Sequence, residues 1–283
     1  MIVMLRGGAV LALIFGAMTA NANAAAPIWI TGSPERNFTY QGKPIDPRCV
    51  AALVPTESNS PKEVDLGDCT KPGKVVRRGA SFEIEEPDPY AVMDTPFDSY
   101  EILASNGSRF VVSTLASGGG SGLFSDLFLI DKDRNRLTAE KFFMETGDRC
   151  NGGLAGAAIH GHQLQMSVNM TPEDVITLGG AKSFRGLEYA AQSCVATGDW
   201  EYDLDTGKLH LASETLTLSF FGGSAEAKSG LLSDQPGWTE QYAYQHCFNV
   251  YYNGYISRDH KKLSPVEIKN FTRGFARTCL TKQ

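Results

Sequence analysis

The sequence YEILASNGSRFVVSTL, residues 100–115, carries the strongest signal for the fold of this chain. Two runs that contain β-branched and aromatic residues flank Asn106-Gly107, and both of these turn residues tolerate the positive φ angles of a tight hairpin. The pattern therefore predicts two antiparallel strands joined by a short turn.

Three more strand–turn–strand units follow this hairpin. Their polar turns lie at residues 131–136, 160–163 and 205–208, between apolar or alternating runs. Successive hairpins of this kind predict an antiparallel meander, arranged as a sandwich or as a propeller-like stack of sheets. One short helix interrupts them, since Thr171-Pro172 has the residue types of a helix start and Gly179-Gly180 those of a helix end.

The C-terminal residues change to a helical pattern. Residues 264–267, Ser-Pro-Val-Glu, form a capping box with proline at the first helical position. Behind it, Ile268, Phe271, Phe275 and Cys279 recur at spacings of three and four, which places them on one face of a helix. A preceding helix is expected from Thr239 to about Tyr252. The predicted class is α+β: a β-rich antiparallel meander followed by a disulfide-clipped helical hairpin.

The first residues have the order of a secretory signal. Arg6 precedes the apolar run at residues 9–15, and Ala22-Asn23-Ala24 supplies the small residues that a signal peptidase recognises. The apolar run is too short to span a bilayer. We therefore expect a signal peptide at residues 1–24, a β-rich domain at residues 25–223 and a helical hairpin at residues 224–283.

Six cysteines follow the predicted signal peptide. An even number of cysteines in an exported chain predicts disulfides with no free thiol. Six cysteines allow fifteen pairings, and pairing of near neighbours is the simplest of them. It joins Cys49 to Cys69, Cys150 to Cys194, and Cys247 to Cys279. The expected location is the periplasm of a Gram-negative bacterium, with secretion as the alternative.

The charge of the chain excludes some partners. The net charge is -6, and loss of Arg6 with the leader gives -7, because the leader contains no acid. An acidic chain lacks the basic surface that nucleic acids and anionic lipids require. The one basic cluster, at residues 71–78, is followed by acids at residues 83–88 and is interpreted as a solvated strand face. No integral membrane segment is expected after the leader.

Three motifs suggest a ligand, and each lacks part of its pattern. His160-Gly161-His162 lies at a hairpin tip without a third metal ligand at a suitable spacing. Residues 131–142 begin like a calcium loop but lack its glycine and its final glutamate. The glycine-rich run at residues 118–122 has neither the Lys-Ser/Thr pair nor the helix of a phosphate loop. The sequence therefore predicts no metal and no cofactor.

The candidate binding site is the polar cluster around Cys150. A disulfide at Cys150 would hold Asp148, Arg149 and Asn151 in place beside glycines that let a ligand approach the backbone. The alternative is a tight structural turn in which Arg149 pairs with Asp148.

These observations favour a non-enzymatic exported binding protein, such as an inhibitor, an immunity protein or an envelope interaction module, with a protein or another envelope component as its partner. The sequence indicates no oligomeric state. The alternative is a periplasmic hydrolase that acts on a cell-wall or carbohydrate substrate through paired carboxylates. The acids available for it are Glu83, Glu85, Glu86, Asp88, Asp94 and Asp98.

Overall fold

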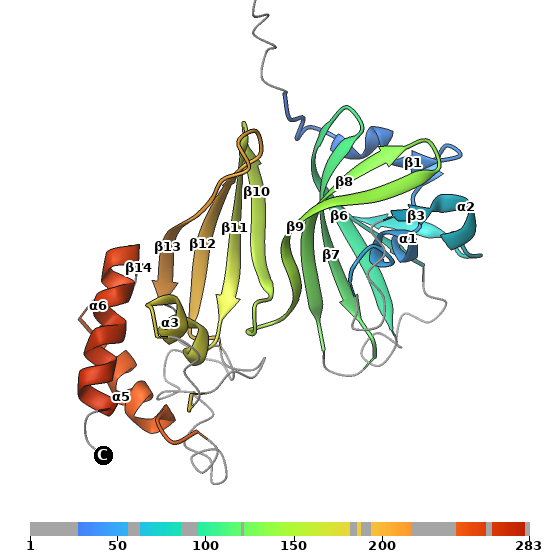
Figure 1. Cartoon of the computed structure of the whole chain (residues 1–283). Helices are drawn as coiled ribbons and strands as arrows, with labels where there is room; N and C mark the ends of the chain where they lie inside the picture. The colour runs from blue at the N-terminus through green and yellow to red at the C-terminus, as the bar shows by residue number, and fades with distance from the viewer. Residues whose placement is uncertain are drawn as a thin grey trace, which may run out of the picture.

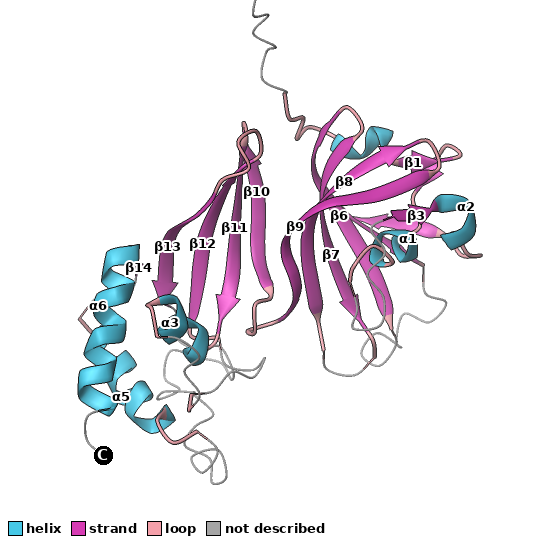
Figure 2. Ribbon diagram, viewed as in Figure 1, coloured by secondary structure: helices cyan, strands magenta, loops and turns pink. Residues whose placement is uncertain are grey.

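The computed structural model describes residues 28–55, 63–85, 96–119, 122–181, 186–187, 194–216, 242–258 and 262–280. The predicted signal peptide lies outside the described residues, and so does the predicted domain boundary at residues 223–224. Figures 1 and 2 show two antiparallel sheets and a small group of helices.

The larger sheet has seven antiparallel strands in the order β3-β9-β8-β7-β6-β5-β4, and it curls into a half-barrel (Figure 1). Its strands are β3 (Glu63–Asp65), β4 (Val75–Arg78), β5 (Ser81–Ile84), β6 (Phe97–Asn106), β7 (Arg109–Ser117), β8 (Phe124–Asp133) and β9 (Arg136–Asp148). The predicted hairpin joins β6 to β7, but its two turn residues are Gly107 and Ser108, because Asn106 ends β6 and pairs with Arg109. Gly107 has a φ of 62°, whereas Asn106 keeps a negative φ.

The smaller sheet has five antiparallel strands in the order β10-β11-β12-β13-β14. They are β10 (Leu154–His160), β11 (Gln163–Met170), β12 (Ala196–Asp203), β13 (Leu209–Leu216) and β14 (Lys262–Leu263). The remaining predicted turns join β8 to β9, β10 to β11 and β12 to β13. The expectation of an antiparallel meander is therefore confirmed.

One face of the larger sheet is covered by short N-terminal elements (Figure 1). These are η1 (Pro34–Asn37), the two-residue strands β1 (Thr39–Tyr40) and β2 (Lys43–Pro44), α1 (Pro47–Ala51) and α2 (Leu66–Cys69). Phe38 packs edge-on against Tyr100 and Phe110. The buried Tyr100 hydroxyl donates a hydrogen bond to the Ile45 carbonyl oxygen at 3.0 Å, so the polar end of this aromatic side chain is satisfied.

The opposite face of the larger sheet packs on the smaller sheet. Val111, Leu127 and Leu129 from the first meet Leu164, Met166 and Tyr202 from the second, and Trp29 joins the same cluster. Apolar side chains from two sheets thus form one core, as in a sandwich.

The helices pack on the smaller sheet at its other end. They are α3 (Pro172–Leu178), α5 (Gln245–Ile256), α6 (Pro265–Phe275) and its π-helical continuation η3 (Ala276–Leu280). The predicted apolar face is buried, since Ile268, Phe271 and Phe275 are each 1% exposed or less. The helix starts predicted at Thr171 and Ser264 carry capping boxes, Thr171 with Asp174 and Ser264 with Glu267.

Helix α5 differs from the sequence prediction. It continues through Asn253 and Gly254 to Ile256, although glycine costs about 1 kcal/mol in a helix interior. Tyr252 and Ile256 are buried in the helical core, and this packing outweighs the local preference. The described start is Gln245, and Thr239 lies outside the described residues.

The structure contains the three disulfides that near-neighbour pairing predicted: Cys49–Cys69, Cys150–Cys194 and Cys247–Cys279. The first joins α1 to α2, and the third clips α5 to η3. These disulfides are compatible with an exported protein. None of the helices in the described ranges is long and apolar enough to cross a membrane.

The C-terminal helix offers a direct test of its packing. We expect Ser264→Ala to lower the free energy of unfolding by about 1 kcal/mol, because its Oγ caps the Glu267 amide. Phe275→Ala removes a fully buried ring and is expected to cost about 3–5 kcal/mol. Val266→Ala, at a side chain that is 67% exposed, is the control and is expected to change little. Urea unfolding measures all three, and equal effects for Ser264 and Phe275 would contradict a packed, capped helix.

Candidate functional site

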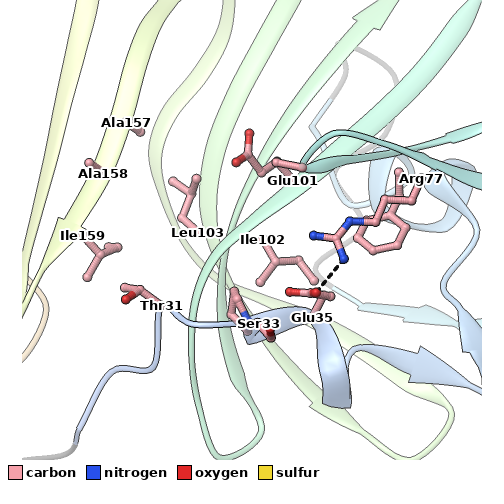
Figure 3. Close-up of a pocket in the computed structure, with 13 residues that line it drawn as sticks. Thr31, Ser33, Glu35, Arg77, Glu101, Ile102, Leu103, Ala157, Ala158 and Ile159 are labelled. Carbon is pink, nitrogen blue, oxygen red and sulfur yellow. Dashed lines mark hydrogen bonds and ion pairs between the residues drawn. The ribbon is translucent and has the colours of Figure 1, made fainter.

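A groove lies between the two sheets, where β4, β5 and β6 face the edge strand β10 (Figure 3). Its volume is about 310 Å³, at the small end of the range of ligand pockets. On one side it is lined by residues 101–103 of β6 and on the other by residues 157–159 of β10, while residues 31–35 of the N-terminal segment complete it. Arg77, Ala80 and Phe82 also line it, so the site combines four segments that are far apart in the sequence.

Strand edges flank this groove on both sides. Within the described ranges, β10 is an edge strand that pairs only with β11. β6 pairs with β5 as far as Glu101, and Ser105 exchanges two backbone hydrogen bonds with Ile30, at 2.8 and 3.0 Å. Among the described residues, the intervening residues 102–104 have no strand partner on that side. Backbone groups next to the groove are thus available to a ligand.

The groove contains three ionisable side chains. Arg77 donates to Glu35 Oε1 at 2.8 Å and to the Gly79 carbonyl oxygen at 2.9 Å, and its guanidinium lies 5.6 Å from the centre of the Phe82 ring. Arg77 is therefore held by a carboxylate, a carbonyl and an aromatic face. Figure 3 shows the Glu101 carboxylate pointing away from Arg77, and no interaction joins it to the other residues drawn. With one arginine and two glutamates, the groove has a formal charge of -1.

A second acidic cluster lies near the start of α1. Asp46 caps this helix and accepts hydrogen bonds from the Arg48 amide, from Arg48 Nε and Nη2, and from the Lys71 amide, at 2.6–3.2 Å. Burial alone would raise the pKa of Asp46, but these hydrogen bonds outweigh burial and hold its pKa below the usual range. Both of its oxygens are occupied, so Asp46 serves to hold the loop at residues 71–72 next to the Cys49–Cys69 disulfide.

Asp98, on β6, interacts with Asp46, and its pKa is shifted in the opposite direction. Burial raises the pKa of Asp98, and repulsion from Asp46 raises it further, while Arg48 partly offsets both effects. Asp98 is one of the acids that the sequence offers for hydrolysis, and its raised pKa is the feature that bears on that role.

The predicted site residues Asp148, Arg149 and Asn151 lie in the turn that joins β9 to β10, and hence the two sheets. Asp148 and Asn151 exchange two backbone hydrogen bonds. Asp148 Oδ1 accepts from the Leu123 amide at 3.0 Å and from Arg149 Nε at 3.2 Å. None of these residues lines the groove. Their role in binding stays a prediction.

This turn is built around close backbone approaches. A Cβ on Gly147 would lie 1.9 Å from the Gly152 carbonyl oxygen, and one on Gly153 would lie 2.3 Å from the Arg149 carbonyl oxygen. Side chains cannot be accommodated there without movement of the backbone. Together with the Cys150–Cys194 disulfide, these contacts hold the connection between the sheets in one arrangement.

The His-Gly-His motif and the calcium-like loop form contacts within the fold. His162 Nδ1 lies 2.9 Å from Asp205 Oδ2 across neighbouring turns, and His160 is exposed. Asp131 accepts from Ser108 Oγ at 2.5 Å, and Asn135 Nδ2 donates to Asp65 at 2.9 Å. In the described ranges, no group of three His, Cys, Asp or Glu side chains is arranged to hold a metal ion.

Comparisons with protein-family models, curated proteins and solved structures found no match to this chain. The groove was not predicted from the sequence either, because its walls come from separate hairpins. One signal was present in the sequence. Residues 154–159, LAGAAI, contain no charge and no proline, so they lack the residues that usually protect an edge strand.

Asp98→Asn is expected to raise stability at pH 7. When an acid has a higher pKa in the folded than in the unfolded state, the free energy of unfolding falls as the pH rises from the unfolded-state pKa to the folded-state pKa. Ionised Asp98 therefore destabilises the fold at pH 7. The gain should shrink toward zero below the ordinary aspartate pKa of about 3.9. Urea midpoints across the pH range measure it. Asp46→Asn is the matched control with the opposite sign, because the lowered pKa of Asp46 stabilises the fold above that pKa.

Arg149→Ala tests the turn between the sheets. The Arg149–Asp148 ion pair is partly exposed, so its loss should lower stability by about 1 kcal/mol or less and leave ligand binding intact. Arg134→Ala is a matched control, since Arg134 also has a positive φ, 42° against 48° for Arg149, but lies in the β8–β9 turn. Thermal unfolding and binding are measured on both variants. Weaker binding without a loss of stability would instead assign Arg149 to the binding site.

Proposed function

We propose that this chain is an exported, non-enzymatic binding protein whose ligand occupies the groove between the two sheets. The observation that supports this most directly is the open edge of β10 along the groove, because unpaired backbone groups are ready-made hydrogen-bonding partners. The three disulfides, which are compatible with export, support the first part of the proposal. The partner expected from the sequence is a protein or another envelope component.

A periplasmic hydrolase is the second candidate, and the raised pKa of Asp98 is the observation that favours it. Hydrolysis through two carboxylates requires both to reach the substrate. Asp46, the acid coupled to Asp98, already accepts four hydrogen bonds. In the groove, Glu35 is bound to Arg77, which leaves Glu101 without a second free acid among the lining residues. Binding is therefore better supported than hydrolysis.

Site-specific photo-crosslinking in the native envelope tests this function. A benzoylphenylalanine at Ala158, which is exposed on the groove side of β10, is expected to form an adduct with one partner. The same probe at Val250, 62% exposed on α5, is the control and should not form it. An adduct at Val250 alone would contradict the assignment to the groove. Turnover of cell-wall fragments that is lost in Asp98→Asn would support the hydrolase instead.

A further inference from the structure

We propose that the ligand of the groove is an extended peptide segment that adds to β10 as a sixth strand of the smaller sheet and places a lysine or arginine beside Glu101. This inference rests on the proposed function and names the chemistry of the partner. It combines two independent features, the backbone geometry of β10 and the charge of the groove.

The register of β10 determines which backbone groups face the groove. The β10–β11 hairpin has a two-residue turn, Gly161-His162, so the flanking pair His160–Gln163 is hydrogen-bonded. Hydrogen-bonded and non-hydrogen-bonded pairs alternate along an antiparallel ladder. Ile159 and Ala157 are therefore in non-hydrogen-bonded pairs with β11, and their amide and carbonyl groups point outward. Both residues line the groove.

As far as the described residues show, β10 lacks the protection that the other sheet edges have. Edge strands are usually guarded by charges, by shortness or by cover from another element. β4 carries Arg77 and Arg78, β3 has three residues of which two are acidic, and β14 covers part of β13. β10 has seven residues, and its register shift between Leu154 and Gly156 leaves residues 156–160 regular. The small side chains at Ala157 and Ala158 leave room for a neighbouring strand.

The charge of the groove selects among possible strands. Glu35 and Arg77 neutralise each other, which leaves the charge of Glu101 without a counter-ion among the lining residues. A basic side chain on the incoming strand supplies that counter-ion, and the whole acidic chain favours its approach. Two-fold pairing of β10 with a second copy of this chain would instead repeat Glu101 on both sides of the interface. A basic peptide is therefore favoured over self-association.

The test uses a displayed library of short random peptides selected against the intact protein. Selected peptides are expected to alternate strand-forming residues and to share a lysine or arginine at one position. Glu101→Gln should weaken their binding about tenfold and remove the preference for that basic residue. Ala157→Pro removes an outward amide without breaking the β11 ladder, so it should abolish binding while the protein stays folded. Ala158→Pro breaks a ladder hydrogen bond and is the control that should lower stability instead.

N-methylation of the selected peptide tests the same ladder without altering the protein. Methyl groups on one set of alternate amides should abolish binding, and methyl groups on the other set should have little effect. Equal effects of the two sets, or selection of peptides without a basic residue, would overturn the proposal. The proposal would also be overturned if the protein formed a dimer and Ala157→Pro abolished it. A specific adduct at Ala158 together with a failed selection would leave the binding function standing and reject only the basic peptide strand.

Discussion

The two central strands of the larger sheet, β7 and β8, are apolar on both faces, and the rest of the structure depends on covering them. Side chains alternate between the faces of a strand, so the runs at residues 110–112 and 127–130 place large apolar groups on both sides. Phe110 and Phe128 face the core under α1, whereas Val111 and Leu127 face the smaller sheet. A hairpin sheet with one solvated face would leave one of these sets in water.

The smaller sheet covers one of these apolar faces, and this packing creates the groove. It packs on the outer face of the larger sheet with one of its own faces, and the helices take the remaining part of its apolar surface. Its other face is polar, with Asp199 accepting hydrogen bonds from Ser167 and Ser213 at 2.8 and 3.0 Å. Because the two sheets are packed face to face and not joined edge to edge, the edge of β10 and residues 102–104 of β6 have no strand partner where the sheets meet, in the described part of the chain.

The disulfides and buried charges stabilise places where secondary structure is short. α1 and α2 have five and four residues, too few to be stable alone, and Cys49–Cys69 joins them to each other while Asp46 caps α1 and binds Arg48. Cys150–Cys194 lies at the turn between the sheets. Under the proposed function, a connection fixed by these contacts would reduce the entropy lost when a ligand enters the groove.

The sequence by itself determined the hairpins and the capped helix starts, because each depends on residues that are neighbours or nearly so. It favoured the disulfide pairing only as the simplest of fifteen, since the partners lie 20, 44 and 32 residues apart. The turn at Gly107 needs only the freedom of glycine to adopt a positive φ, and Ser264 needs only Glu267 three residues later. The tertiary structure alone decided the length of α5, where burial of Ile256 outweighs the local preference of Gly254. It also decided the groove, since Glu35, Glu101 and Ala157 come together only when two sheets and the N-terminal segment pack. Packing of apolar faces is not directional, so a pattern of residues along the chain shows that a face will be buried without showing which other element will cover it.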